Sequence, residues 1–440
     1  MLQDWFKDML GKSKRELVER ALSRISDPKG EGSRIFTRVY DGAARESAVF
    51  ADKMAEMGAE SSPLAGIPIS IKDLFDVKGE PTLAGSRVLA NSEPATTDAV
   101  IVRRLRQAGA AIIGKTNMTE FAFSGLGINP HYGTPLNAWQ RSEARIPGGS
   151  SSGAAISVTD GMAAAAIGTD TGGSVRIPAA LNGLVGFKPS AQTVPTAGCL
   201  PLSPSFDSIG PIAASVGMCA RIYAVLENID HQILVPADLR RCTVGAVQNY
   251  VLDQMDVEVA AAYGKALQRL RAAGVTVREV SLPAVDRLHE IFTNGGIVGA
   301  EAYHRHRKLI DEHGDEYDPR VLTRIQRGKL STASDYIEFL NKRRVLTDQW
   351  IQEISAFDAL VMPTVPIIAP PIADLVSEDA YGKVNLLMLR NPTVINALNG
   401  CAISIPCHTR SEAPVGLTLA SHNGRDWPLL SIAMACEQIL

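Results

Sequence analysis

Apolar residues near the N-terminus recur at the spacing of an α-helix. In the segment 14–25, Leu17, Ala21 and Leu22 fall on one face, and an alanine-rich pattern over 42–58 repeats this spacing and ends in glycine. Apolar positions three and four residues apart form one stripe along a helix. The first 60 residues are therefore predicted to form a helical segment.

The pattern changes after residue 63. Segment 64–73 is rich in β-branched residues and is predicted to be a strand, with Lys72 near its end. A helix over 98–108 and a strand over 110–114 are predicted to follow. Helices that alternate with strands are typical of an α/β layer architecture.

The remaining segments extend this alternation. Residues 124–153 are rich in Gly, Pro, Asn and Ser and are predicted to be a long functional loop, and the apolar segment 154–167 is predicted to be a buried helix. No linker or internal repeat divides the chain, which predicts one large domain. Beyond residue 240 we expect strands at 242–248, 276–282, 359–363, 402–406 and 415–420, and helices at 257–273, 335–354 and 426–440.

Charge and hydropathy exclude several classes of protein. The 440 residues include 44 Lys+Arg and 47 Asp+Glu, for a net charge of -3. This balance argues against a nucleic-acid partner. Segment 154–167 is too short to span a bilayer, and Asp4, Lys7 and Asp8 place charges where a signal peptide would be apolar. We expect a cytoplasmic protein with no membrane association.

Cysteine and histidine spacing predicts no metal site. The six cysteines form no CxxC pair and are expected to be reduced thiols. The close pair His304 and His306 lies among basic residues and is expected to be part of a solvated helix face. We therefore expect no metal and no cofactor.

Two glycine-rich loops that carry serines flank the segment 154–167. Residues 147–153 read PGGSSSG, and residues 168–178 read GTDTGGSVRIP. Glycine allows backbone N–H groups to turn toward a bound atom. A serine at the end of such a run can attack a carbonyl carbon while neighbouring N–H groups bind the oxyanion. The loops indicate a serine hydrolase.

A serine nucleophile needs a base, and the sequence offers two candidate arrangements. Residues 149–153 match the G-x-S-x-G nucleophile elbow, but the elbow follows a strand and the preceding RIPG is typical of a loop. The alternative is a serine activated by a lysine that burial keeps deprotonated. Lys72, at the end of an apolar strand, is placed for burial, although a lone lysine is more often exposed.

The three elements together resemble the amidase signature family. Lys72 in GIPISIKD, Ser150 in GGSSSG and Ser174 in GTDTGGSVRIP occur in this order, and the two serines are 24 residues apart, a spacing common in the family. The resemblance covers roughly residues 15–440. It extends to GKTNMTEF at 114–121, GFKP at 186–189, DSIGP at 207–211, IPC at 405–407 and PVGL at 414–417.

The resemblance implies a fold and a catalytic triad. The fold is a single α/β/α domain with a mixed central β-sheet covered by helices on both faces. Ser174 would be the acylated nucleophile, Ser150 the bridging serine after a cis peptide bond, and Lys72 the neutral base. Residues 1–60 would pack on a catalytic core at 61–230, and 231–440 would complete the sheet and supply the pocket helices.

The resemblance also implies roles for the residues around the triad. The backbone N–H groups of Thr171, Gly172 and Gly173, with that of the nucleophile, would form the oxyanion hole. Asp170 and Arg176 would orient the loop through a buried ion pair, although Arg176 could instead meet a substrate carboxylate.

The roles of other neighbouring residues stay open. Ser151 and Ser152 would either bond to the lysine or cap the following helix. The stretch that lines the acyl pocket in relatives corresponds here to Phe121, Ala122, Phe123 and Ser124, with core packing as the alternative for the aromatic residues. Within residues 280–400, candidates for the pocket or the core are Phe292, Tyr303, Tyr336 and Leu387.

The implied activity is hydrolysis of a small-molecule carboxylic amide to the acid and ammonia, by a protein that is a homodimer like many relatives. The alternative is the glutaminase (A) subunit of a glutamyl-tRNA amidotransferase. Such subunits commonly carry Arg-Gln-Pro after the nucleophile, whereas residues 176–178 here read RIP. A non-catalytic assembly subunit is disfavoured because Lys72, Ser150 and Ser174 are all intact.

Overall fold

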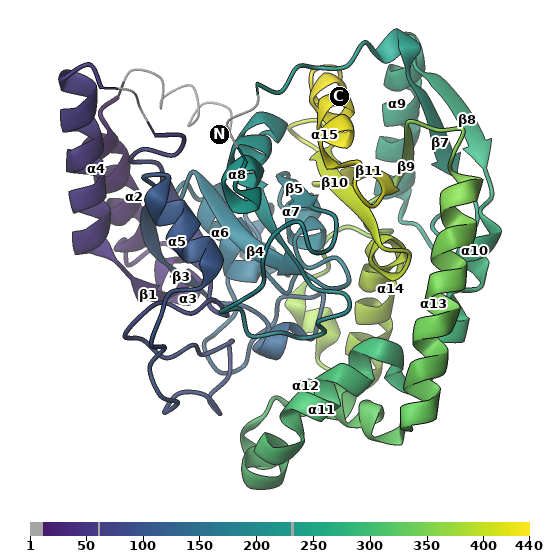
Figure 1. The fold of residues 1–440 in the computed structure, drawn as a ribbon, viewed down its shortest axis with the longest axis horizontal. Coiled ribbons are helices and arrows are strands. Elements are labelled where there is room, and N and C mark those ends of the chain that lie inside the picture. Colours follow the sequence, from purple (N-terminus) through teal and green to yellow (C-terminus); the bar gives the residue numbers. More distant parts are fainter. Residues whose placement is uncertain (1–11, 60–61, 230–232) are drawn as a thin grey trace.

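One mixed sheet runs through the residues that the computed structural model describes, which are 12–59, 62–229 and 233–440 (Figure 1). From one edge to the other, its strands are β1 (Phe36–Val39), β3 (Ala111–Thr116), β2 (Pro68–Lys72), β4 (Ala165–Asp170), β6 (Ser208–Ala213), β5 (Val185–Lys188), β10 (Gly400–Pro406), β11 (Gly416–His422), β9 (Ala359–Pro363), β7 (Thr243–Val247) and β8 (Thr276–Val280). The pairs β2–β3, β2–β4, β7–β8 and β7–β9 are parallel, and the other pairs are antiparallel.

Helices surround this sheet. The α-helices of the described chain are α2 (Lys14–Ile25), α3 (Gly32–Ile35), α4 (Asp41–Glu56), α5 (Val100–Gln107), α6 (Ser152–Thr159), α7 (Arg176–Leu181), α8 (Val216–Glu227), α9 (Val257–Ala272), α10 (Pro283–Asp286), α11 (Gly296–His313), α12 (Pro319–Arg327), α13 (Ala333–Glu353), α14 (Glu378–Ala397) and α15 (Asp426–Glu437). Short 3-10 turns are η1 (Glu120–Ala122), η2 (Arg141–Glu143), η3 (Leu239–Arg241), η4 (Leu288–Ile291), η5 (Thr293–Gly295), η6 (Gly314–Glu316), η7 (Gly328–Leu330) and η8 (Ile372–Leu375).

The helices form a layer on each face of the sheet. Ile403 packs in a core with residues of α5, α8, α9 and α15, whereas its neighbour Ala402 packs with α13 and α14. In β4, Ile167 belongs to the same core as Ile403, whereas its neighbour Ala166 packs with α6 and α7 on the opposite face. Successive side chains of a strand point to opposite faces. The predicted α/β/α architecture with a mixed sheet is confirmed.

The predicted helix over 154–167 is wrong in its second half. Helix α6 ends at Thr159, Gly161 adopts a φ of 65°, and β4 begins at Ala165. Both elements are buried on all sides, so neither shows a periodic pattern, and an apolar run does not distinguish a buried helix from a buried strand. The second serine loop therefore begins where the interior strand β4 ends, at Asp170.

The predicted N-terminal helical segment is interrupted by β1, which pairs with β3. Residues 1–11 and 60 of this prediction lie outside the described residues. Helix α2 has the predicted bounds, because Ser13 caps its first turn. The loop prediction for 124–153 is confirmed up to the start of α6, with only η2 inside it. The elements predicted beyond residue 240 are all present, but the sequence pattern does not predict the α-helices α10, α11, α12 and α14.

Two kinds of feature are not found in the described parts of the chain. None of their helices combines the length and the apolarity that crossing a bilayer requires. Nor do three or more His, Cys, Asp or Glu side chains of these residues gather in a way suited to a metal ion.

Candidate active site

Lys72 and the second serine loop meet where two neighbouring strands end. Strands β2 and β4 are parallel, with Ile71 opposite Ile167, so both chains leave the sheet at the same edge. Lys72 Nζ donates hydrogen bonds to Ser150 Oγ at 2.7 Å and to Thr169 Oγ1 at 2.9 Å. The sequence prediction missed Thr169, although parallel pairing of the two strands would have placed it beside Lys72.

Burial changes the ionisation of Lys72. Its side chain is inaccessible to solvent, and the loss of hydration lowers its pKa from 10.5 to about 7. The nearby acidic groups of Cys199, Asp207 and Asp170 act in the opposite direction but are outweighed. Its two hydrogen-bond partners are neutral hydroxyls. A large fraction of Lys72 is consequently a neutral amine at neutral pH, as a base requires.

The first serine loop holds Ser150 against this amine. The peptide bond from Gly149 to Ser150 is cis, as the resemblance implied. A Cβ at Gly149 would lie 2.5 Å from the backbone N of Gly127 and 2.8 Å from Thr119 Oγ1, so only glycine is accommodated. The amide of Thr119 donates to the Ser150 carbonyl at 3.1 Å and fixes the loop from the other side.

The next two serines take neither of the roles that the sequence suggested. Ser151 Oγ donates to the carbonyl of Thr169 at 3.5 Å, and it neither caps α6 nor forms a hydrogen bond with Lys72. Ser152 Oγ is buried and has no partner within the described chain. Ser151 thus links the first serine loop to β4, and its contact with the base is indirect, through Thr169.

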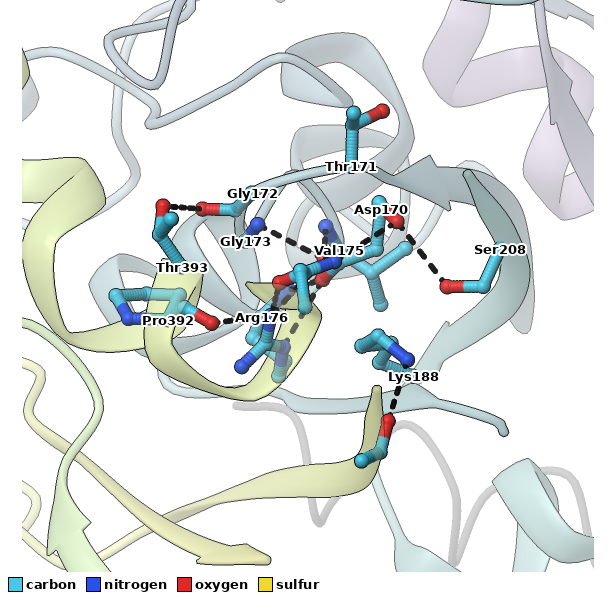
Figure 2. Close-up of polar contacts among 12 residues, drawn as sticks. Asp170, Thr171, Gly172, Gly173, Val175, Arg176, Lys188, Ser208, Pro392 and Thr393 are labelled. Atoms are coloured by element: carbon cyan, nitrogen blue, oxygen red, sulfur yellow. Dashed lines mark hydrogen bonds and ion pairs between the residues drawn. The ribbon is translucent and has the colours of Figure 1, made fainter. Parts of the chain in front are cut away.

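Asp170, the last residue of β4, anchors the second serine loop. Figure 2 shows Gly173, Val175 and Arg176 converging on its carboxylate. The Gly173 amide donates to Oδ1 at 2.8 Å, and Arg176 donates from Nε to Oδ2 at 3.0 Å and from Nη2 to Oδ1 at 2.9 Å. Both charged side chains are fully buried. The expected ion pair is therefore present and shielded from water.

The charge of Arg176 keeps Asp170 ionised. Burial by itself would raise the pKa of Asp170, but the Coulombic attraction and hydrogen bonds of Arg176 outweigh it and hold that pKa below its ordinary value. Arg176 Nη2 also donates to the Pro392 carbonyl at 3.0 Å (Figure 2). It donates as well to Asn396 Oδ1 at 2.5 Å. These hydrogen bonds connect helix α14 to the second serine loop. Arg176 does not line the cavity next to Ser174.

We expect Asp170→Asn to destabilise the fold by about 3–5 kcal/mol, because it leaves the buried Arg176 cation without its counter-charge. Urea unfolding of the variant and the wild-type chain measures the difference. A matched control is Asp379→Asn, which removes an exposed pair with Lys383 and should cost less than about 1 kcal/mol. Equal losses in the two variants would contradict the anchoring role of Asp170.

The loop also presents unpaired amides. Within the described chain, the backbone N–H groups of Thr171, Gly172 and Ser174 donate to no protein group. The N–H of Gly173 is occupied by Asp170, and the carbonyl of the same peptide accepts from Thr393 Oγ1 at 3.3 Å (Figure 2). In this structure the Gly173 N–H is therefore not free to bind an oxyanion, because that peptide is held at both ends by Asp170 and Thr393.

The second serine loop borders a cavity of about 360 Å³. Its wall includes Thr171, Gly172 and Ser174. Of the four predicted pocket residues, Ala122, Phe123 and Ser124 line it. Phe121 does not: its ring lies 4.3 Å from that of His306 and 5.2 Å from that of Tyr317, in the core. The chain turns at positive φ at residues 121 and 122, so neighbouring side chains leave in different directions.

Distant segments close the cavity. Among the four other candidates Phe292 lines it, Tyr303 and Tyr336 line a neighbouring cavity of about 600 Å³, and Leu387 lines neither. Helix α14 instead contributes four residues at the spacing of one helix face, a signal that the sequence carried. They are Leu386, Leu389, Arg390 and Thr393.

Comparisons with known proteins agree with this geometry. Residues 16–430 match the family model described as Amidase. The chain is 35% identical over 414 residues to 2-amino-5-chloromuconic acid deaminase of Comamonas testosteroni, covering 92% of this chain and 88% of that protein. It is 32% identical to the (A) subunit of the glutamyl-tRNA(Gln) amidotransferase of Chloroflexus aggregans, covering 96% and 92%. A crystal structure of an amidase superposes with a TM-score of 0.86 at 33% identity, covering 98% of each chain.

Proposed function

Because this chain belongs to the amidase signature family and is an amide hydrolase, we propose that it cleaves a small carboxylic amide to the acid and ammonia through an acyl-enzyme on Ser174. The observation that carries this proposal is the buried Lys72 amine, 2.7 Å from Ser150 Oγ, with Ser174 on the wall of the adjacent cavity. A buried neutral lysine next to a serine is the arrangement that activates a hydroxyl nucleophile.

In the proposed first half-reaction, Ser174 Oγ attacks the carbonyl carbon of the amide. Its proton passes to Ser150, whose own hydroxyl proton passes to Lys72 Nζ. The oxyanion of the tetrahedral intermediate accepts from the free amides of Thr171, Gly172 and Ser174. Each such donor contributes about 3–4 kcal/mol to the transition state.

Collapse of the intermediate breaks the carbon–nitrogen bond. The proton held by Lys72 returns through Ser150 to the leaving nitrogen, and ammonia departs. Water then attacks the ester carbon while the same relay takes its proton, and Ser174 is released together with the acid.

The glutaminase subunit of a tRNA amidotransferase is the second candidate, supported by 32% identity to such a protein over 96% of this chain. Against it stand the RIP sequence at 176–178 and the absence of a basic excess. The two functions differ in whether a partner is needed and in whether glutamine is the substrate.

We also propose that the chain acts as one domain, as a homodimer and in the cytoplasm. The catalytic residues fall within 61–230, and 231–440 supplies the far wall of the cavity. All six cysteines are free thiols, as in a reducing compartment. Light scattering coupled to size-exclusion chromatography measures the oligomeric state directly, and a monomer would contradict the dimer.

Ammonia release by the purified chain, with a panel of aliphatic and aromatic amides and with glutamine, tests the proposed function. Turnover of simple amides without a partner supports a standalone amidase. Turnover of glutamine alone would favour the amidotransferase function, and a chain that releases ammonia from none of them would contradict both.

A further inference from the structure

The cavity beside Ser174 carries two cationic side chains on a largely apolar wall. Arg327, the last residue of α12, and Arg390 of α14 both line it. Among the described residues no Asp or Glu lines the cavity, so no acidic side chain neutralises the two positive charges within it. The rest of the wall is largely apolar, and its larger residues are Phe123, Leu202, Phe206, Phe292, Val298, Leu386 and Leu389.

Arg390 is held in place by the backbone. It donates from Nη2 to the carbonyl of Val251 at 2.9 Å, from Nη1 to that of Asp253 at 2.6 Å and from Nε to Asn391 Oδ1 at 2.9 Å. A guanidinium has five N–H donors, so two of them stay available. Its charge is therefore fixed at the cavity wall with part of its hydrogen-bonding capacity unused.

Arg327 has a different environment. Within the described chain its guanidinium makes no hydrogen bond or ion pair, although Arg320 on the same helix pairs with Glu378 at 2.9 Å. Its stem lies beside Gly295, where an added Cβ would be 3.5 Å from the Arg327 Cβ. Arg327 is exposed to solvent although it lines the cavity, and its five donors have no protein partner in the described chain, in the planar fork that binds a carboxylate through two hydrogen bonds.

We propose that the substrate is an amide whose acyl chain ends in a carboxylate, which Arg327 binds while Arg390 adds positive potential. This inference rests on the proposed function, since it assumes that the amide carbon lies at Ser174. The apolar wall between the two ends matches a hydrocarbon spacer. An α-amino acid such as glutamine matches less well, because its ammonium group would enter a cationic cavity without a partner.

Three amides with four methylene groups between the amide carbon and the terminal group test the proposal: adipamate, hexanamide and 5-aminopentanamide, which end in a carboxylate, a methyl and an ammonium group. We expect kcat/KM for ammonia release to be about 10- to 100-fold higher for adipamate than for hexanamide, because a charged ligand group gains charge-assisted hydrogen bonds. The ammonium amide should be the poorest substrate. Arg327→Gln should bring the ratio of adipamate to hexanamide close to one.

Lys329→Gln is the matched control, because it removes an exposed charge two residues away that does not line the cavity. It should leave the ratio of the two amides as in the wild-type chain. Equal kcat/KM for adipamate and hexanamide, or equal effects of the two variants on their ratio, would overturn the carboxylate proposal while leaving amide hydrolysis intact.

A binding measurement separates this proposal from the catalytic one. Calorimetry with adipate and hexanoate on Ser174→Ala needs no turnover. Tighter binding of adipate that is lost in the double variant with Arg327→Gln supports the carboxylate site even if no amide is hydrolysed. Indistinguishable binding of adipate and hexanoate would overturn it even if hexanamide is a good substrate.

Discussion

Replacing Ser174 with alanine is expected to lower kcat/KM for ammonia release by at least about 10⁴-fold, because a serine nucleophile and its relay act as a unit. Ser174 lies on the cavity wall beside the free amides of Thr171 and Gly172. Alanine keeps the backbone of the loop and the ion pair of Asp170 with Arg176, which bind no part of the Ser174 hydroxyl. The loss should therefore be chemical, with the folded structure and its thermal stability retained.

The control for this variant is Ser152→Ala in the other serine loop. Ser152 Oγ is buried without a hydrogen-bond partner in the described chain. Its removal therefore takes away an unsatisfied polar group and should leave the free energy of unfolding unchanged or slightly higher. Activity should stay within about twofold of the wild-type chain, since no proposed proton transfer passes through this hydroxyl. Substantial turnover by Ser174→Ala, or inactivation by Ser152→Ala, would contradict the assignment of the nucleophile.

The residues of the proposed relay are predicted by the resemblance to the amidase signature family, since a lysine such as Lys72 taken alone is more often exposed. Lys72 ends a buried strand, and Ser150 and Ser174 lie in loops whose glycines are needed at close approaches. Such features depend on a few neighbouring residues. The ion pair between Asp170 and Arg176 spans six residues and was foreseen for the same reason.

What the sequence could not show depends on backbone conformation or on distant segments. The interaction of Gly173 with Asp170 required the actual turn, in which Gly173 has a φ of 121°. Phe121 turned into the core because of a similar local reversal. Thr393 and Arg327 reach the cavity from helices far along the chain, and no local pattern brings such segments together.

We expect kcat/KM to rise with pH and to level off above the pKa of Lys72, which burial lowers to about 7. Only the neutral amine accepts a proton, and deprotonation removes a charge that the buried site does not solvate. Below pH 7 the rate should fall about tenfold for each pH unit, because the neutral fraction falls by that factor. A profile of kcat/KM from pH 5 to 9 measures this fall on the acidic side, the acidic limb. A neutral amide is used so that ionisation of the substrate does not contribute.

Asp207 is a charged neighbour of Lys72 that also titrates in this range, since burial raises its pKa to about 6. Its carboxylate accepts from Thr171 Oγ1 and from the amides of Leu202 and Ser203, so it supports the nucleophile loop. In Asp207→Asn the acidic limb should persist if Lys72 is its source, although the maximal rate falls. Loss of the limb in this variant would assign it to Asp207 instead.

The variants Lys72→Arg and Lys72→Met test whether Lys72 acts as a proton acceptor or only as a positive charge. Arginine retains the cation but has no accessible neutral form, and methionine retains only the apolar bulk, so both should lose at least about 10³-fold in kcat/KM at every pH. If the Lys72 cation served only to attract the substrate, arginine would preserve activity while methionine would not. An active Lys72→Arg chain, or a rate that does not change between pH 5 and 8, would therefore exclude Lys72 as the base, whatever the result at Ser174.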